Sequence, residues 1–107
     1  HFNQYRIFIR LVHTDYVREH QVSYYALKMN MRPAALCRIV KKESGHTAME
    51  IINNTIIMDA KAQLCTANTP IKDIAVSLGF NNAAFFNKFF KRHTGIPPQK
   101  FRTSSKQ

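Results

Sequence analysis

The chain has 107 residues, 45% of them apolar and 21% charged, which is the balance of a folded domain and not of a disordered segment. Its 16 lysines and arginines against 6 acidic residues give a formal charge of +10. This favours a polyanionic partner, with nucleic acid ahead of an anionic membrane or an acidic protein. The chain has only three glycines, and this low number favours helix over sheet. The longest apolar runs are far too short to span a membrane.

Catalytic and metal-binding patterns find little support. Cys37 and Cys65 form no C-x-x-C motif and have no histidine at zinc spacing, and the five histidines are scattered. The aspartates are too far apart in sequence for a carboxylate pair, and there is no glycine-rich phosphate loop. We therefore expect no enzyme, no metal, no cofactor and a reducing, cytoplasmic setting.

The first predicted helix covers residues 2–19. Apolar residues recur there at a spacing of three and four, which is typical of an amphipathic helix. The expected buried stripe is Phe2, Tyr5, Ile9, Val12 and Tyr16, with Phe8 and Leu11 beside it.

A helix-turn-helix pattern follows. Ser23 is the expected N-cap of a short helix to about residue 29, and Asn30 suits a turn with left-handed backbone. A second helix over about 32–44 carries proline near its start, where the missing N–H does no harm, and Gly45 ends it.

The next helix begins at a capping-box pattern, T-x-x-E, from Thr47 to Glu50, and should run from about residue 48 to 65. Its length suits a linker between two lobes. Its apolar residues are a stripe of Ile52, Ile56, Ala60 and Leu64, widened by Met49, Ile57 and Met58.

A second helix-turn-helix pattern starts at Thr69, the expected cap of a helix to about residue 78. Gly79 makes the turn, Phe80 packs back into the core, and a helix over about 82–94 ends at Gly95. Phe86, Phe89 and Phe90 should face the core, whereas Phe85 should be partly exposed. We expect a last helical turn over 98–101.

The two patterns form an internal repeat. Ala26 and Met29 match Ala75 and Leu78 at a separation of about 49 residues. Beyond the turn the separation grows to about 50 residues, so that Arg38 corresponds to Lys88. Two such lobes in one chain can reach two successive major grooves, about 34 Å apart, without a dimer.

The segment I-x-x-I-A-x-x-L-G-F, followed by F-x-x-x-F-K-x-x-x-G-x-x-P-x-x-F-R, runs from Ile71 to Arg102. It resembles the signature of the AraC/XylS family of bacterial transcription regulators, and the match extends upstream to about Val22. The resemblance implies an all-α domain of about seven helices, with two homeodomain-like helix-turn-helix lobes joined by a long linker helix. It also implies a regulatory or sensor region elsewhere in the protein, and many members activate transcription. Many relatives have an arginine in the linker helix where this chain has Thr55 and Ile56, which weakens any role of this helix in contacting DNA.

The expected organisation is one DNA-binding domain over 1–107. The first lobe takes residues 1–45, the linker 46–66, the second lobe 67–102 and a disordered tail 103–107. We expect the domain alone to be monomeric and to bind double-stranded DNA.

Major-groove reading requires outward side chains near the start of each lobe's second helix. Arg38 suits a bidentate contact to guanine, and Asn87 could pair with adenine. The alanines offer only methyl contacts. The expected base-reading residues are Arg32, Ala34, Ala35, Cys37, Arg38, Asn82, Ala83, Ala84, Asn87 and Lys88.

Phosphate contacts are expected from the helix starts and from nearby cations. These residues are Ser23, Lys28, Lys41, Lys42, Thr69, Lys72, Lys91 and Arg92. The alternative function is a basic protein-interaction module that docks on RNA polymerase or a sensor partner, which the alanine-rich reading faces would suit.

Overall fold

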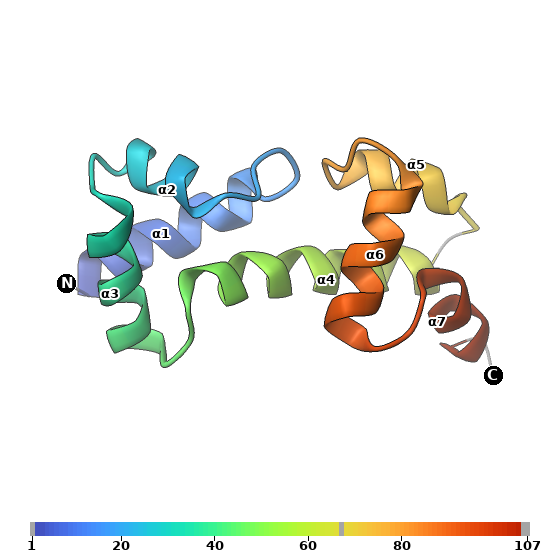
Figure 1. Ribbon diagram of the computed structural model, residues 1–107. Helices are drawn as coiled ribbons and strands as arrows, with labels where there is room; N and C mark the ends of the chain where they lie inside the picture. Colours follow the sequence, from blue (N-terminus) through green and yellow to red (C-terminus); the bar gives the residue numbers. More distant parts are fainter. Residues whose placement is uncertain (1, 67, 106–107) are drawn as a thin grey trace. The chain divides into compact units, whose positions relative to one another are not determined.

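The computed structural model describes residues 2–66 and 68–105, and over these residues the fold is all α-helical, as expected (Figure 1). Two compact units, His1–Thr55 and Ile56–Gln107, divide the chain. The helices are α1 (Phe2–Asp15), α2 (Val22–Lys28), α3 (Pro33–Ser44), α4 (Ala48–Thr66), α5 (Ile71–Ser77), α6 (Ala83–Thr94) and α7 (Pro98–Ser105). None of the described helices is both long and apolar enough to cross a membrane.

In the first unit, α1, α2 and α3 pack on one another. Phe8, Tyr25 and Leu36, one from each helix, are fully buried, and the rings of Phe8 and Tyr25 meet edge to face at 5.8 Å between centroids. Burial of such large side chains is what holds three short helices together.

The buried face of α1 differs from the expected stripe. Phe8 and Val12 are buried, whereas Tyr5, Ile9 and Tyr16 are only half-buried, and the Phe2 side chain lies outside the described residues. The helix ends at Asp15, four residues before the expected end.

The early end of α1 is explained by the buried carboxylate of Asp15. It accepts hydrogen bonds from the Tyr24 hydroxyl at 2.6 Å and from the Arg18 guanidinium at 3.2 Å. Hydrogen bonds from the Arg18 and Glu19 amides to the Asp15 carbonyl close a turn at this point. The hydrogen bond from Tyr24 is the main reason why the pKa of Asp15 is lowered.

Two expected N-caps are wrong. The N-cap of α2 is Gln21 and that of α5 is Pro70, and neither makes a side-chain cap hydrogen bond. Because α2 begins at Val22, Ser23 already lies inside its first turn. Thr69 lies one residue before the cap, and its carbonyl accepts a hydrogen bond from Arg102 at 2.7 Å.

The capping box of α4 is confirmed. The Thr47 amide donates to the Glu50 carboxylate at 2.7 Å, and the Glu50 amide donates to the Thr47 hydroxyl at 3.0 Å. The bond from the Thr47 amide is the largest cause of the lowered pKa of Glu50.

The expected stripe of α4 is also confirmed, because Ile52, Ile56, Ala60 and Leu64 are all fully buried. Ile57 widens it, but Met49 and Met58 do not, with exposed fractions of 37% and 71%. The boundary between the two units falls within α4, between Thr55 and Ile56.

In the second unit, α6 packs on α5 and α7. Phe86 and Phe90 are fully buried, as expected, and Phe90 contacts the ring of Phe101 on α7 at 5.6 Å. Phe80 returns to this cluster, with its ring 5.4 Å from that of Phe86.

The expected end of the chain needs correction. Helix α7 runs on to Ser105, so residues 103–105 are helical and not part of a disordered tail; residues 106–107 lie outside the described residues. The helix is anchored by buried Arg102, which donates to the carbonyls of Leu64 at 3.2 Å and Thr69 at 2.7 Å. These bonds satisfy a carbonyl in the last turn of α4, which explains why an arginine is buried here.

Candidate nucleic-acid interface

The same turn is built in both units. Where α2 ends, the Met31 amide donates to the Ala26 carbonyl at 2.8 Å; where α5 ends, the Phe80 amide donates to the Ala75 carbonyl at 3.0 Å. Asn30, at a φ of 57°, occupies the left-handed region at the position where the other turn has Gly79. Asparagine and glycine are the residues that tolerate this conformation, so the repeat read from the sequence is a structural repeat.

The second helix of each turn also ends in the same way. Gly45 and Gly95 have left-handed backbones and close onto the carbonyls of Lys41 and Lys91. Helices α3 and α6 therefore follow the same kind of turn and end in the same way.

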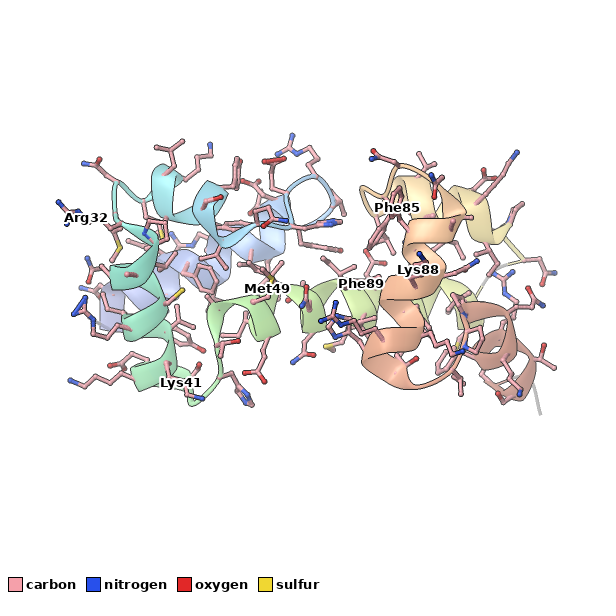
Figure 2. All side chains as sticks on the ribbon, in the orientation of Figure 1. Arg32, Lys41, Met49, Phe85, Lys88 and Phe89 are labelled. Carbon is pink, nitrogen blue, oxygen red and sulfur yellow. The ribbon has the colours of Figure 1, made fainter. Side chains whose placement is uncertain are left out.

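Each of these two helices buries one face and exposes the other. Leu36 and Val40 of α3 are fully buried, as are Phe86 and Phe90 of α6. Arg32 lies at the start of α3, and Lys88 lies on α6 one turn beyond Phe85 (Figure 2). Among the expected base-reading residues, Arg32, Ala34, Cys37, Arg38, Asn82, Ala84, Asn87 and Lys88 are exposed, and Ala35 and Ala83 are half-buried.

Asn82 also has a structural role that was not predicted from the sequence. It is the N-cap of α6, and its side-chain oxygen accepts a hydrogen bond from the Phe85 amide at 3.0 Å. Its position directly before a helix was the available signal. Because the side-chain oxygen of Asn82 caps the helix, its side-chain amide nitrogen is the group that can contact DNA.

The expected phosphate-binding residues differ in their surroundings. Lys42, Lys72, Lys91 and Arg92 are exposed, as is Ser23, whereas Thr69 is half-buried. The Lys28 ammonium lies 5.9 Å from the centre of the Tyr24 ring, and the Lys41 ammonium donates to the Gly45 carbonyl at 3.0 Å. Lys28 and Lys41 are thus partly engaged within the first unit.

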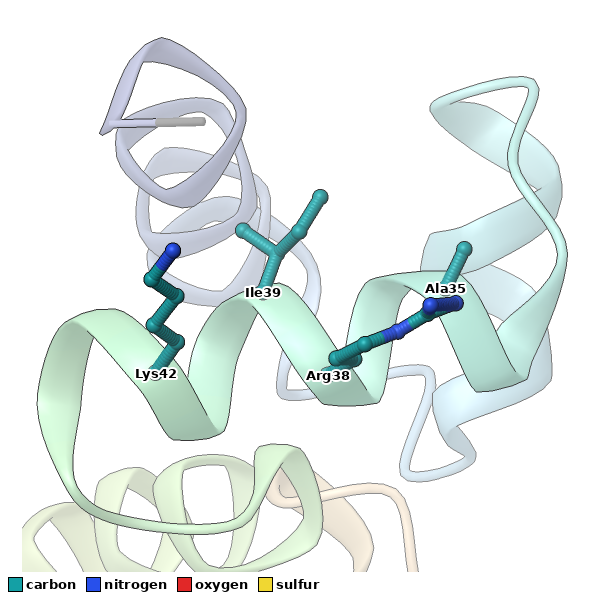
Figure 3. A pocket seen from close by; sticks show the side chains of 4 residues that line it. All are labelled: Ala35, Arg38, Ile39 and Lys42. Carbon is teal, nitrogen blue, oxygen red and sulfur yellow. The ribbon is translucent and has the colours of Figure 1, made fainter.

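A hollow of about 320 Å³ lies along α3, between its exposed and its buried face (Figure 3). Ala35, Arg38, Ile39 and Lys42 line it, four residues that recur at helical spacing along α3. Two of the four lining residues, Arg38 and Lys42, are exposed cations. Within the described residues there is no cluster of three or more histidine, cysteine, aspartate or glutamate side chains that could hold a metal ion.

These features define a protein with two helix-turn-helix units, each with a basic outward helix. The profile of the helix-turn-helix domain family matches residues 25–104, and the chain belongs to this family in its AraC/XylS form, as the resemblance predicted. It is the DNA-binding domain of a transcription regulator.

Related proteins support this assignment. The chain is 39% identical over 74 residues to the bifunctional transcriptional activator/DNA repair enzyme AdaA of Bacillus subtilis, covering 69% of this chain and 35% of that protein. It is 31% identical over 72 residues to the multiple antibiotic resistance protein MarA of Escherichia coli, covering 67% of this chain and 57% of MarA. The chain spans less than two thirds of the length of either relative.

Two solved structures share the fold. The C-terminal domain of AraT, a response regulator from Geobacillus stearothermophilus, has a TM-score of 0.88 at 22% identity, over 94% of this chain and 84% of that one. The DNA-binding domain of AdpA, a global transcriptional factor solved in complex with a target DNA, has a TM-score of 0.81 at 16% identity, over 94% and 90%.

Proposed function

We propose that the chain reads double-stranded DNA in two successive major grooves, with α3 in one groove and α6 in the next. The observation that carries this proposal is the repeat: the same turn and the same helix ends occur twice, and both outward helix faces carry exposed cations. A helix with a buried apolar face and an exposed face of this kind fits the major groove.

In this proposal a small number of side chains read bases directly. Arg38 makes a bidentate contact to guanine, Lys88 contacts guanine from the equivalent position of α6, and Asn87 pairs with adenine. The alanines contribute methyl contacts. Direct reading by few residues leaves a large share of the binding to phosphate contacts and to DNA shape.

Phosphate contacts come from the exposed cations on and near the two helices, among them Lys42 in the first unit and Lys72, Lys91 and Arg92 in the second. The Ser23 and Thr69 hydroxyls cap no helix, so any contribution from them is to the phosphate directly. Each neutralised phosphate adds about −0.9 to the slope of log K against log salt concentration.

The wider role follows from the family and is part of the proposal. The domain is the non-enzymatic, cytoplasmic output domain of a regulator with an upstream sensor region, and it is monomeric by itself. The HTH-type transcriptional activator RhaS of Mannheimia succiniciproducens is among the relatives, which supports activation of transcription as the mode of action. RNA polymerase is the proposed partner in that role.

Selection from random duplexes followed by footprinting tests the proposal. We expect one enriched sequence with two protected half-sites about one helical turn apart. Equal affinity for the selected and for random duplexes at physiological salt would reject sequence reading, and would favour the protein-interaction module that the exposed Ala34 and Ala84 also suit.

A further inference from the structure

One pair of equivalent positions on the two reading helices differs strongly in side-chain size. The 50-residue offset that pairs Arg38 with Lys88 also pairs Lys42 with Arg92, so both helices keep their cations. The same offset pairs Ala35 with Phe85. A methyl group thus stands in α3 where α6 has an aromatic ring.

The surroundings of the two positions differ accordingly. Ala35 is half-buried and lines the hollow on α3 (Figure 3). The Phe85 ring is 57% exposed on the first turn of α6. Other phenylalanines of the second unit contact one another through their rings, namely Phe80, Phe86, Phe89, Phe90 and Phe101. Phe85 is therefore an exposed apolar side chain outside the core.

The position of Phe85 is well defined. Its amide is held by the Asn82 side chain at 3.0 Å, which fixes the first turn of α6. Lys88 follows three residues later, and side chains at this spacing are neighbours on one helix face (Figure 2). An exposed phenyl ring next to a cation on a domain of charge +10 fits a ligand that is anionic overall and has an apolar group within reach.

The DNA major groove has one such group, the C5-methyl of thymine. We infer that Phe85 is a specificity-determining residue of α6 that packs on a thymine methyl in its half-site, next to the base contacted by Lys88. The equivalent Ala35 is too short for the same contact, so the two lobes read different half-sites. This inference rests on the proposed DNA reading by α6.

Replacing thymine by deoxyuridine tests this, because the exchange removes the methyl group alone. Each thymine of the selected duplex is exchanged in turn, and the affinity of the 107-residue chain is measured by fluorescence anisotropy. We expect the wild type to lose about fourfold in affinity at one thymine of the α6 half-site, the factor that corresponds to one buried methyl group. With Phe85→Ala, the same exchange should have no effect there, while exchanges in the α3 half-site should act as in the wild type.

Val76→Ala is the matched control, because Val76 is a 64% exposed apolar side chain on α5 of the same unit. It should keep the wild-type response to deoxyuridine, and thermal unfolding should show that both variants are folded. The inference is overturned if no thymine of the α6 half-site shows the effect, or if Phe85→Ala retains it. If no sequence is selected at all, the proposed function fails and this inference fails with it.

Discussion

At the scale of single residues, the proposed base contacts depend on two cations at equivalent positions. Arg38→Ala should weaken binding to the selected duplex by about 1–3 kcal/mol and relax the preference for one base pair, because a bidentate contact to guanine is lost. Lys88→Ala should do the same in the other half-site. Competition binding against single-base variants of the duplex measures both effects.

Arg10→Ala is a suitable control for these variants, because Arg10 is exposed on α1 and its loss also removes one positive charge. It should weaken selected and random duplexes alike. Equal losses on both kinds of duplex with Arg38→Ala would contradict direct reading by that residue.

Asp15 is a buried carboxylate whose ionisation affects the stability of the first unit. Its pKa is lowered from 3.8, chiefly by the Tyr24 hydroxyl, so the folded state prefers the carboxylate. The stabilisation is present above the unfolded pKa and is lost as the pH falls through the folded one. Asp15→Asn should therefore lower Tm at pH 7, with a difference from the wild type that narrows below pH about 4.

Thermal unfolding followed by circular dichroism between pH 7 and pH 2.5 measures this narrowing. Glu19→Gln provides the control. It also removes one carboxylate from this region, but none of the hydrogen bonds described above is made to the Glu19 carboxylate. A gap between Asp15→Asn and the wild type that stays constant over the whole pH range would rule out the carboxylate as its source.

At the scale of secondary-structure elements, the capping box decides where α4 begins. Thr47→Ala removes the acceptor for the Glu50 amide and should cost about 0.5–2 kcal/mol of unfolding free energy. Urea denaturation measures this cost. Thr14→Ala makes a good comparison, because the Thr14 hydroxyl bonds only to the Arg10 carbonyl within α1, and we expect little or no loss there. Equal losses for the two variants would contradict a capping role of Thr47.

At the scale of the whole molecule, two reading helices in one chain make the spacing of the half-sites a measurable constraint. Inserting about 5 base pairs between them turns one half-site to the opposite face of the duplex. Affinity should then fall to that of a single half-site, and the salt dependence should become shallower because fewer phosphates are contacted. Electrophoretic mobility shifts at several salt concentrations measure both. Unchanged affinity would show that one unit does all of the binding.

Most of the fold could be predicted because its signals are local. Asn30, Gly45 and Gly95 mark positions where the backbone is left-handed, and the stripe from Ile52 to Leu64 follows from helical periodicity.

The candidate site was harder to predict, because exposure depends on how neighbouring helices pack. Periodicity placed Phe86 and Phe90 in the core, but the task of Asn82 as a cap and the hollow on α3 required the packed helices.

The amino-acid sequence alone determined the two helix-turn-helix units, their repeat and the basic character of the chain, because turn residues, apolar spacing and charge act over a few neighbouring residues. Tertiary structure alone decided where α1 stops and how far α7 extends. Near those ends, side-chain hydrogen bonds join separate elements, from Tyr24 of α2 to Asp15 of α1 and from Arg102 of α7 to Leu64 of α4. Such bonds form only once buried apolar faces have brought the helices together, so a local sequence pattern does not predict them.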